Sequence, residues 1–325
     1  MLSRTADHLF WMARYTERAE NTARMLDVQH QAALLPQPDA GSAAAARSAE
    51  HLDWQGLLGI SELTEAYTAR HGDIEAGKVL DFMVSDMGNL SSIQSCLRAA
   101  RENARAVRGA ITTEVWETIN QTWLESWRLL ADGRFERDPG EYFEWVKNRS
   151  HLSRGVTSGT MLQDEAFHFL RIGTFLERAD NTARLLDVKF HALQAEFHGS
   201  ANGRLQEYDF YYWSSVLRSV SGFEVYRKVY RDVITPERVA ELLILRPDMP
   251  RSLAACLLEG TVHLRAVANR GSQETLRRAG LLNAELQYGQ VAEIMATGLH
   301  AWLTRFLERI NDLGNSISQD FLVAS

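Results

Sequence analysis

The chain has 325 residues, of which 45% are hydrophobic and 24% charged, with only 21 Gly and 6 Pro. This composition excludes a disordered or collagen-like chain, and so few helix breakers favour long helices over a turn-rich β architecture. The formal charge of -7 excludes the basic footprint of a general nucleic-acid binder.

The first predicted helix begins almost at Met1 and ends near Leu35, before a stretch that contains Pro36 and Pro38. Its apolar stripe has a spacing of three and four residues and comprises Leu9, Met12, Thr16, Ala19, Ala23 and Leu26. A polar set flanks that stripe at the same spacing, formed by Arg14, Glu17, Arg18, Asn21 and Arg24. The stretch "LPQPDAGSAAAARS" is the most linker-like in the chain.

A second helix carries an arginine array within "RAARENARAVRGAI", and Ser91 with Gln94 resembles its capping box. We expect a solvated or salt-bridged cationic face here. The alternative is a ligand site whose basic wall would comprise Arg101, Asn103 and Arg105.

Further helix starts are predicted where a capping side chain precedes proline or an acidic or amide residue. They lie at Asp138 with Pro139 and Glu141, at Thr160 with Gln163, and at Thr235 with Pro236. The segment "SRGVTSG" then reads as the short connection before the next long helix, with a border near Ser158.

Self-similarity organises the whole chain, because "ERAENTARMLDV" at residues 17–28 returns as "ERADNTARLLDV" at residues 177–188. The same offset of 160 relates the helix after Ser91 to that after Arg251, and an offset of 159 pairs Trp54 with Trp213. We therefore expect an all-α, long-helix bundle built from two homologous halves, residues 1–158 and 159–325, packed as one body. Each half should contain roughly six helices.

The residues shared by the two long helices are Glu17, Arg18, Asn21 and Arg24 in the first half and Glu177, Arg178, Asn181 and Arg184 in the second. One interpretation is structural: ion pairs hold the helices in register inside the bundle. The other is functional: the Arg forks and Asn amide bind a carboxylate or phosphate, with Glu as orienting group or base.

Other chemistry finds little support in the sequence. Glu165 and His168 form a lone Glu-x-x-His, whereas di-iron bundles use such motifs in pairs, and Thr5 stands opposite Glu165. His8 and His168 are equivalent, and we expect hydrogen-bonded core histidines. No phosphate loop is present. We therefore expect no metal and no cofactor.

The location of the protein follows from what the sequence lacks. It has two cysteines, no signal-like start and no apolar run near the length needed to cross a bilayer. We expect a cytoplasmic protein with no membrane contact and no nucleic-acid partner.

The segment "MLSRTADHLFWMARYTERAENTARMLDV", with "ARENARAVR" and "FLERADNTARLLDV", resembles the bacterial Alpha-E family, an all-helical family of uncharacterised function with a Glu-Arg motif. The resemblance spans nearly the whole chain. It implies a setting beside, or fused to, circularly permuted ATP-grasp ligases, and often near transglutaminase-like peptidases.

Two functional hypotheses follow from this resemblance. The first is a non-catalytic helical partner of an ATP-grasp ligase in peptide or amide-bond synthesis or modification, able to bind a peptide or a small anionic ligand. The second is an enzyme of peptide or amide chemistry, with Glu17 or Glu177 as base and the arginines as anion clamp. The sequence leaves open whether the chain is catalytic.

Overall fold

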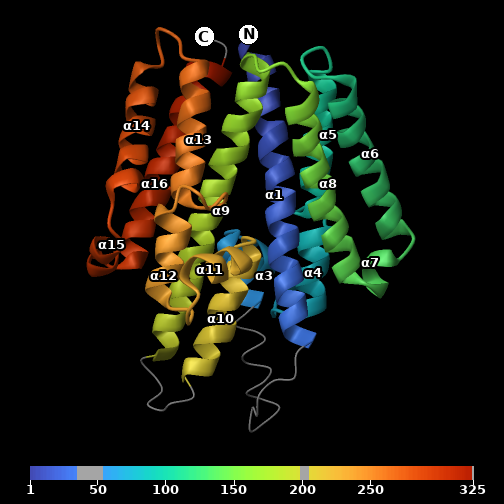
Figure 1. Ribbon diagram of the computed structural model, residues 1–325. Helices are drawn as coiled ribbons and strands as arrows, with labels where there is room; N and C mark the ends of the chain where they lie inside the picture. Colours follow the sequence, from blue (N-terminus) through green and yellow to red (C-terminus); the bar gives the residue numbers. More distant parts are fainter. Residues whose placement is uncertain (35–53, 198–204, 324–325) are drawn as a thin grey trace.

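Two long helices form the centre of the molecule (Figure 1). The computed structural model describes residues 1–34, 54–197 and 205–323, and throughout these ranges the regular structure is helical, without a strand. The all-α prediction is confirmed. The central helices are α1 (Ser3–Leu34) and α9 (Glu165–Phe197), which pack side by side.

Each central helix is covered by helices that follow it in the chain. Helix α1 packs against α5 (Ile93–Ala106) and α8 (Pro139–Thr160), and α6 (Thr113–Ala131) contacts both of these. Helix α9 packs against α13 (Leu253–Ala266) and α16 (Leu299–Ile317), and α14 (Gln273–Tyr288) contacts both. Figure 1 shows these groups on opposite sides of the α1–α9 pair.

Shorter helices complete the bundle and make the elements more numerous than the roughly six expected per half. Residues 54–60 are helical, and the remaining short helices are α3 (Thr64–His71), α4 (Ala76–Val84), α7 (Arg134–Arg137), α10 (Leu205–Ser219), α11 (Phe223–Tyr230), α12 (Pro236–Ala240) and α15 (Val291–Thr297). The described part of the chain also contains the π-helical turns η1 (Glu241–Leu245) and η2 (Ser318–Leu322).

The central helices approach closely at Gly173. A Cβ atom there would overlap the backbone carbonyl of Phe10 and touch the methyl group of Ala13. Only glycine permits this approach of the two backbones. The contact lies one helical turn before Glu177, so it brings the polar side chains of α1 and α9 within reach of each other.

The expected helix starts are partly confirmed. Asp138 caps α8 by accepting a hydrogen bond from the Glu141 N–H, and Thr235 caps α12 by accepting one from Arg238. The prediction at Ser91 is wrong by one residue, because the Ser92 hydroxyl accepts from the Ser95 N–H. Serines 91 and 92 are equally good caps by type, so local sequence did not separate them.

The connection expected at "SRGVTSG" is also wrong, because α8 continues through it to Thr160. Its hydroxyl side chains bond back to the helix, as Thr157 does to the carbonyl oxygen of Ser153. The chain turns instead over residues 161–164, and Asp164 caps α9 by accepting from the N–H groups of Ala166 and Phe167. The linker-like stretch at residues 35–48 lies outside the described residues.

Candidate functional site

The Glu-Arg pairs of the two central helices bind each other crosswise. Arg18 on α1 donates to both carboxylate oxygens of Glu177 on α9, from Nε at 2.5 Å and from Nη2 at 3.1 Å. Arg178 on α9 does the same to Glu17 on α1, at 2.8 and 3.0 Å. These four residues, here called the crossed ER pair, join α1 to α9 through two bidentate contacts.

The Glu177 end of the crossed ER pair is compact. Arg14 adds a third contact, from Nε to Glu177 Oε2 at 2.6 Å. Burial alone would raise the pKa of Glu177, but Arg14 and Arg18 outweigh it and lower the pKa to about 2. Arg14 and Arg18 remain 17% and 28% exposed at the side chain, so solvent reaches both guanidinium groups.

The Glu17 end gathers more cations from more elements. Arg251, just before α13, donates to Glu17 at 3.0 Å, to Asn21 Oδ1 at 2.8 Å and to Glu20 at 2.5 Å. Arg154 on α8 donates to Glu17 Oε2 at 3.1 Å and also to Glu20. Residues from α1, α8, α9 and the start of α13 therefore meet at Glu17.

Glu20 is the second carboxylate of this cluster and is completely buried. Besides Arg154 and Arg251, it binds Arg24 through Nε at 2.9 Å and accepts from the Ser150 hydroxyl at 2.6 Å. Burial opposes ionisation of Glu20, yet Arg251, Arg154 and Arg24 hold its pKa well below the usual value. The pKa of Glu17 is lowered in the same way, against its burial, by Arg178 and Arg251.

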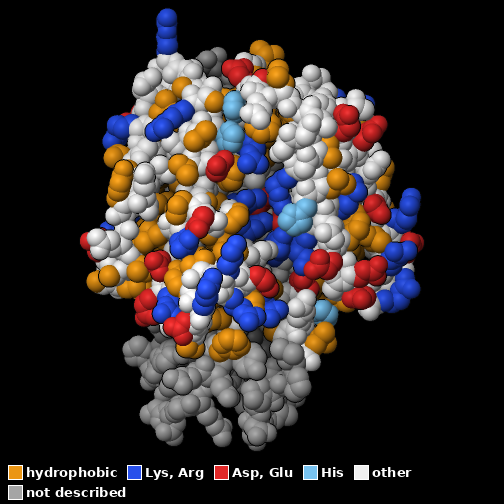
Figure 2. Space-filling view, in the orientation of Figure 1, with side chains coloured by type: hydrophobic (Ala, Val, Ile, Leu, Met, Phe, Trp, Pro, Cys, Tyr) orange, Lys and Arg blue, Asp and Glu red, His pale blue; other side chains and the backbone are white. Residues whose placement is uncertain are grey.

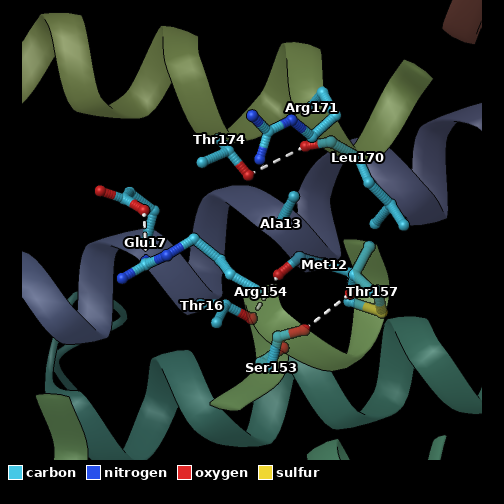
Figure 3. A pocket seen from close by; sticks show the side chains of 10 residues that line it. All are labelled: Met12, Ala13, Thr16, Glu17, Ser153, Arg154, Thr157, Leu170, Arg171 and Thr174. Carbon is cyan, nitrogen blue, oxygen red and sulfur yellow. Dashed lines mark hydrogen bonds and ion pairs between the residues drawn. The ribbon is translucent and has the colours of Figure 1, made fainter. Parts of the chain in front are cut away.

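A small cavity of about 30 Å³ opens beside Glu17. Figure 3 shows Arg154 reaching from α8 to Glu17, while Arg171 and Thr174 on α9 border the same space from the other side. Arg154 also lies 2.8 Å from Nδ1 of His151, whose Nε2 lies 3.0 Å from Arg24. We call the surface around Arg24, His151, Arg154 and Arg171 the basic hollow; Figure 2 shows blue and pale-blue side chains gathered in the hollowed middle of this face.

Comparison with known proteins gives this arrangement a family. The chain matches, over residues 1–322, a family described as a predicted alpha-helical domain with a conserved ER motif, named Alpha-E. The chain belongs to the Alpha-E family. The crossed ER pair supplies a structural setting for the Glu-Arg sequence from which that family takes its name.

Two curated relatives are similar over most of this Alpha-E protein. Uncharacterized proteins of Mycobacterium bovis and Mycobacterium tuberculosis are each 23% identical over 333 residues, covering 95% of this chain. The chain spans only 35% of the length of each relative. No solved structure matches the chain.

The predicted site residues divide into two groups in this Alpha-E protein. Glu17, Arg18, Glu177 and Arg178 meet directly, and Asn21 and Arg24 join the Glu17 end. Arg184 lies about two turns further along α9 than Glu177. It binds Asp180 at 2.8 Å and also Glu62, and Asn181 is half-buried.

The α5 residues make contacts of their own, away from the crossed ER pair. Arg101 donates to Asn120 at 2.8 Å and to Glu102 at 2.7 Å, and the exposed Arg105 also pairs with Glu102. Asn103 lies 2.7 Å from His8. These contacts agree with a salt-bridged outer face for Arg101 and Arg105 and give Asn103 a partner on α1.

Sequence reasoning missed Glu20, His151, Arg154, Arg171 and Arg251. A weak signal existed for Arg251, because it stands at the start of a repeated block where the first half has Ser91. Arg154 lies in the segment "SRGVTSG" that was wrongly expected to be a connection, and His151 lies just before it. Their roles depend on partners more than a hundred residues away in sequence, as with Arg154 and Glu17, 137 residues apart.

The described ranges were examined for metal-ligand groups and for membrane-spanning helices. Within residues 1–34, 54–197 and 205–323, no group of three or more His, Cys, Asp and Glu side chains could hold a metal ion. His168 instead lies 2.9 Å from His263. Among the helices of the same ranges, none has both the length and the apolar character needed to span a bilayer.

Proposed function

We propose that this Alpha-E protein is a non-catalytic binding protein that assists a circularly permuted ATP-grasp ligase in making or modifying a peptide or other amide bond. The observation that carries the proposal is the state of the two ER glutamates. Glu17 and Glu177 are 1% and 4% exposed, and arginine guanidinium groups bind both oxygens of each.

Such carboxylates are poorly suited to act as catalytic bases. A general base works best with a pKa near the operating pH and within hydrogen-bonding distance of the proton it removes. The arginines lower the pKa of Glu17 and Glu177 against the effect of burial, the latter to about 2, and their oxygens are already engaged. The crossed ER pair therefore fits a clamp between α1 and α9 better than a catalytic dyad.

The ligase partnership rests on the family resemblance and on the architecture of the relatives. The sequence has no phosphate loop, so ATP chemistry would come from the partner. The curated relatives are almost three times as long as the matched region, which places the Alpha-E portion beside other segments in those proteins. That arrangement agrees with an Alpha-E domain that acts together with a second, neighbouring domain or protein.

The second candidate is an enzyme of peptide or amide chemistry that uses the Glu-Arg-Asn-Arg cluster. The cavity beside Glu17 favours it, because Glu17 and Arg154 line a space that a reacting group could approach. The described residues around that cavity offer hydroxyl groups, but each of Thr157 and Thr174 donates to a backbone carbonyl of its own helix. No base is within hydrogen-bonding distance to activate either one as a nucleophile.

The proposal includes an origin by internal duplication, with the two halves packed as one body. Residues 159 or 160 positions apart in the sequence make matching contacts, which supports this origin. Tyr67 donates to the Asp73 carbonyl and accepts from the Glu75 N–H, and Tyr226 makes the same two contacts with Val233 and Thr235. The pairs His8–Asn103 and His168–His263 also span the same 95 residues. In this proposal the border between the halves, expected near Ser158, falls in residues 161–164 between α8 and α9.

Reconstitution tests the proposal. The purified chain would be mixed with a circularly permuted ATP-grasp ligase encoded beside it, and complex formation, ATP consumption and amide-bond formation would be measured as the chain is titrated. We expect a complex of fixed stoichiometry and ligase turnover that saturates when the complex is full, with no turnover by the chain alone.

Two outcomes would contradict the proposal. One is the absence of both complex formation and any effect on the ligase. The other is substrate turnover by the isolated chain that Glu17→Gln abolishes while the variant stays folded, which would establish the enzymatic candidate. Arg105→Gln, on the exposed face of α5, serves as the matched surface control.

A further inference from the structure

We infer that the basic hollow is an oxyanion-binding site for the carboxylate or phosphate group of a small ligand. The charges around it do not balance. Five arginines surround two carboxylates, Glu17 and Glu20; the arginines are Arg24, Arg154, Arg171, Arg178 and Arg251. At the other end of the crossed ER pair, two arginines bind one carboxylate and remain open to solvent.

Arg171 is the arginine of this cluster that binds no carboxylate directly, although the charges of Glu259 and Glu17 act on it from a distance. Among the described residues it forms no ion pair, its Nε is buried without an acceptor, and its guanidinium lies 4.6 Å from the ring centre of Phe175. Burial, followed by repulsion from Arg178, lowers its pKa. A buried N–H donor without an acceptor costs free energy, and an anion at the cavity edge would supply both the acceptor and the missing charge.

His151 provides a second, independent observation. Its two ring nitrogens lie 2.8 Å from Arg154 and 3.0 Å from Arg24, and guanidinium nitrogens only donate. A neutral imidazole has one acceptor nitrogen, so only one of these two contacts is a hydrogen bond in any tautomer. A protonated ring would accept neither hydrogen bond. Burial lowers the pKa of His151, and the charges of Arg154 and Arg24 lower it further, against the opposite effect of Glu20.

An oxyanion in the cavity would meet the demand of Arg171, which lines it, and would accept from Arg154, which also lines it and connects it to His151. Carboxylate and phosphate oxygens accept from several donors at once, and arginine forks match their geometry. The cavity of about 30 Å³ has room for an anionic head group only, so the rest of the ligand would lie outside it along the exposed face of α8. The site uses residues of this chain alone and does not depend on the proposed ligase partner.

Calorimetric titration at constant ionic strength tests the site with inorganic phosphate in one arm and acetate in the other. We expect saturable 1:1 binding of at least one anion, and the tighter arm identifies which head group the site takes. Arg171→Gln should weaken that binding at least tenfold. Because Arg171 makes no ion pair, this variant should fold as well as the wild type, and loss of its repulsion toward Arg178 should leave its melting temperature equal or higher.

Arg98→Gln is the matched control, since Arg98 is an exposed arginine on α5 outside the hollow, and its binding should equal that of the wild type. Arg154→Gln extends the test only if it folds, because Arg154 also binds Glu17 and Glu20. The inference is overturned if neither anion binds saturably, or if folded Arg171→Gln binds as tightly as the wild type and the control.

Discussion

The two ends of the crossed ER pair begin from matching residues but lie in different electrostatic surroundings. At the Glu177 end, Arg14 and Arg18 bind one buried carboxylate and extend to the solvent. At the Glu17 end, Arg178 and Arg251 are 8% and 6% exposed, so their charges depend on the carboxylates beside them. The first end is a simple clamp, whereas the second is an enclosed network of charges.

Substitutions at equivalent positions account for this difference. Arg14, which completes the Glu177 end, stands at the position of Thr174 in the second long helix. Arg251, just before α13, stands at the position of Ser91, just before α5, and it binds Glu17 and Glu20. The Glu177 end therefore has two arginines on one carboxylate, whereas the Glu17 end has five arginines around two.

The largest predicted effect separates the two glutamates. Glu17→Gln should lose about 3 to 5 kcal/mol of unfolding free energy, because it removes the shared acceptor of buried Arg178 and Arg251 and leaves their charges poorly compensated. Glu177→Gln should lose less, about 1 to 3 kcal/mol, because Arg14 and Arg18 can turn toward water.

Denaturant unfolding monitored by circular dichroism measures both losses, with Glu62→Gln as a control at an exposed ion pair. Equal losses for Glu17→Gln and Glu177→Gln would refute the distinction between an enclosed network and a solvent-relieved clamp.

A smaller effect concerns the histidines at the matching positions of the two long helices. His8 meets Asn103, whereas His168 meets His263, whose pKa is lowered to about 4 first by burial and then by Arg171 and His168. Below pH 6.5 the unfolded state takes up a proton that folded His263 takes up only near pH 4. The contribution of His263 to the unfolding free energy should therefore be fully present above pH 6.5. It should be lost as the pH falls toward 4, with a slope of at most about 1.4 kcal/mol per pH unit.

His263→Asn recreates the His8–Asn103 arrangement in the second half and should flatten that slope. Urea unfolding of both proteins between pH 7 and 4 gives the comparison. A variant whose stability falls with pH as steeply as the wild type would show that His263 is not the group responsible.

Local signals in the sequence were sufficient for the helical class and for α1. The stripe from Leu9 to Leu26 follows the helical period, and most of its residues are buried as expected. Caps at Asp138 and Thr235 were identified because proline follows each of them. The cap at Ser92 was missed because the neighbouring Ser91 is of the same type, and that at Asp164 because the helix start was expected at Thr160, which lies inside α8.

The candidate site was predictable only in its α1 and α9 portions. Repetition drew attention to Glu17 and Glu177, but it did not show that each would pair with the arginine of the other helix. The departures from the repeat, such as Arg251 opposite Ser91, turned out to shape the Glu17 end. Pairing between distant charges depends on helix packing, as at Gly173, and periodicity within one helix carries no information about it.

The smallest predicted difference is between the two cysteines, where the halves should behave alike. Cys96 and Cys256 are buried, free and at equivalent positions on α5 and α13, and burial raises the pKa of each thiol to about 12. At pH 8 this reduces the reactive thiolate about a thousandfold relative to an ordinary thiol. We expect iodoacetamide to label both thiols slowly and at equal rates in the native protein, and rapidly in denaturant, as read by mass spectrometry.

Faster labelling of Cys256 than of Cys96 in the native protein would contradict this expectation. It would show that the core beside the Glu17 end opens more readily than the core beside the Glu177 end. The difference between the two ends would then include the packing around them as well as their charges.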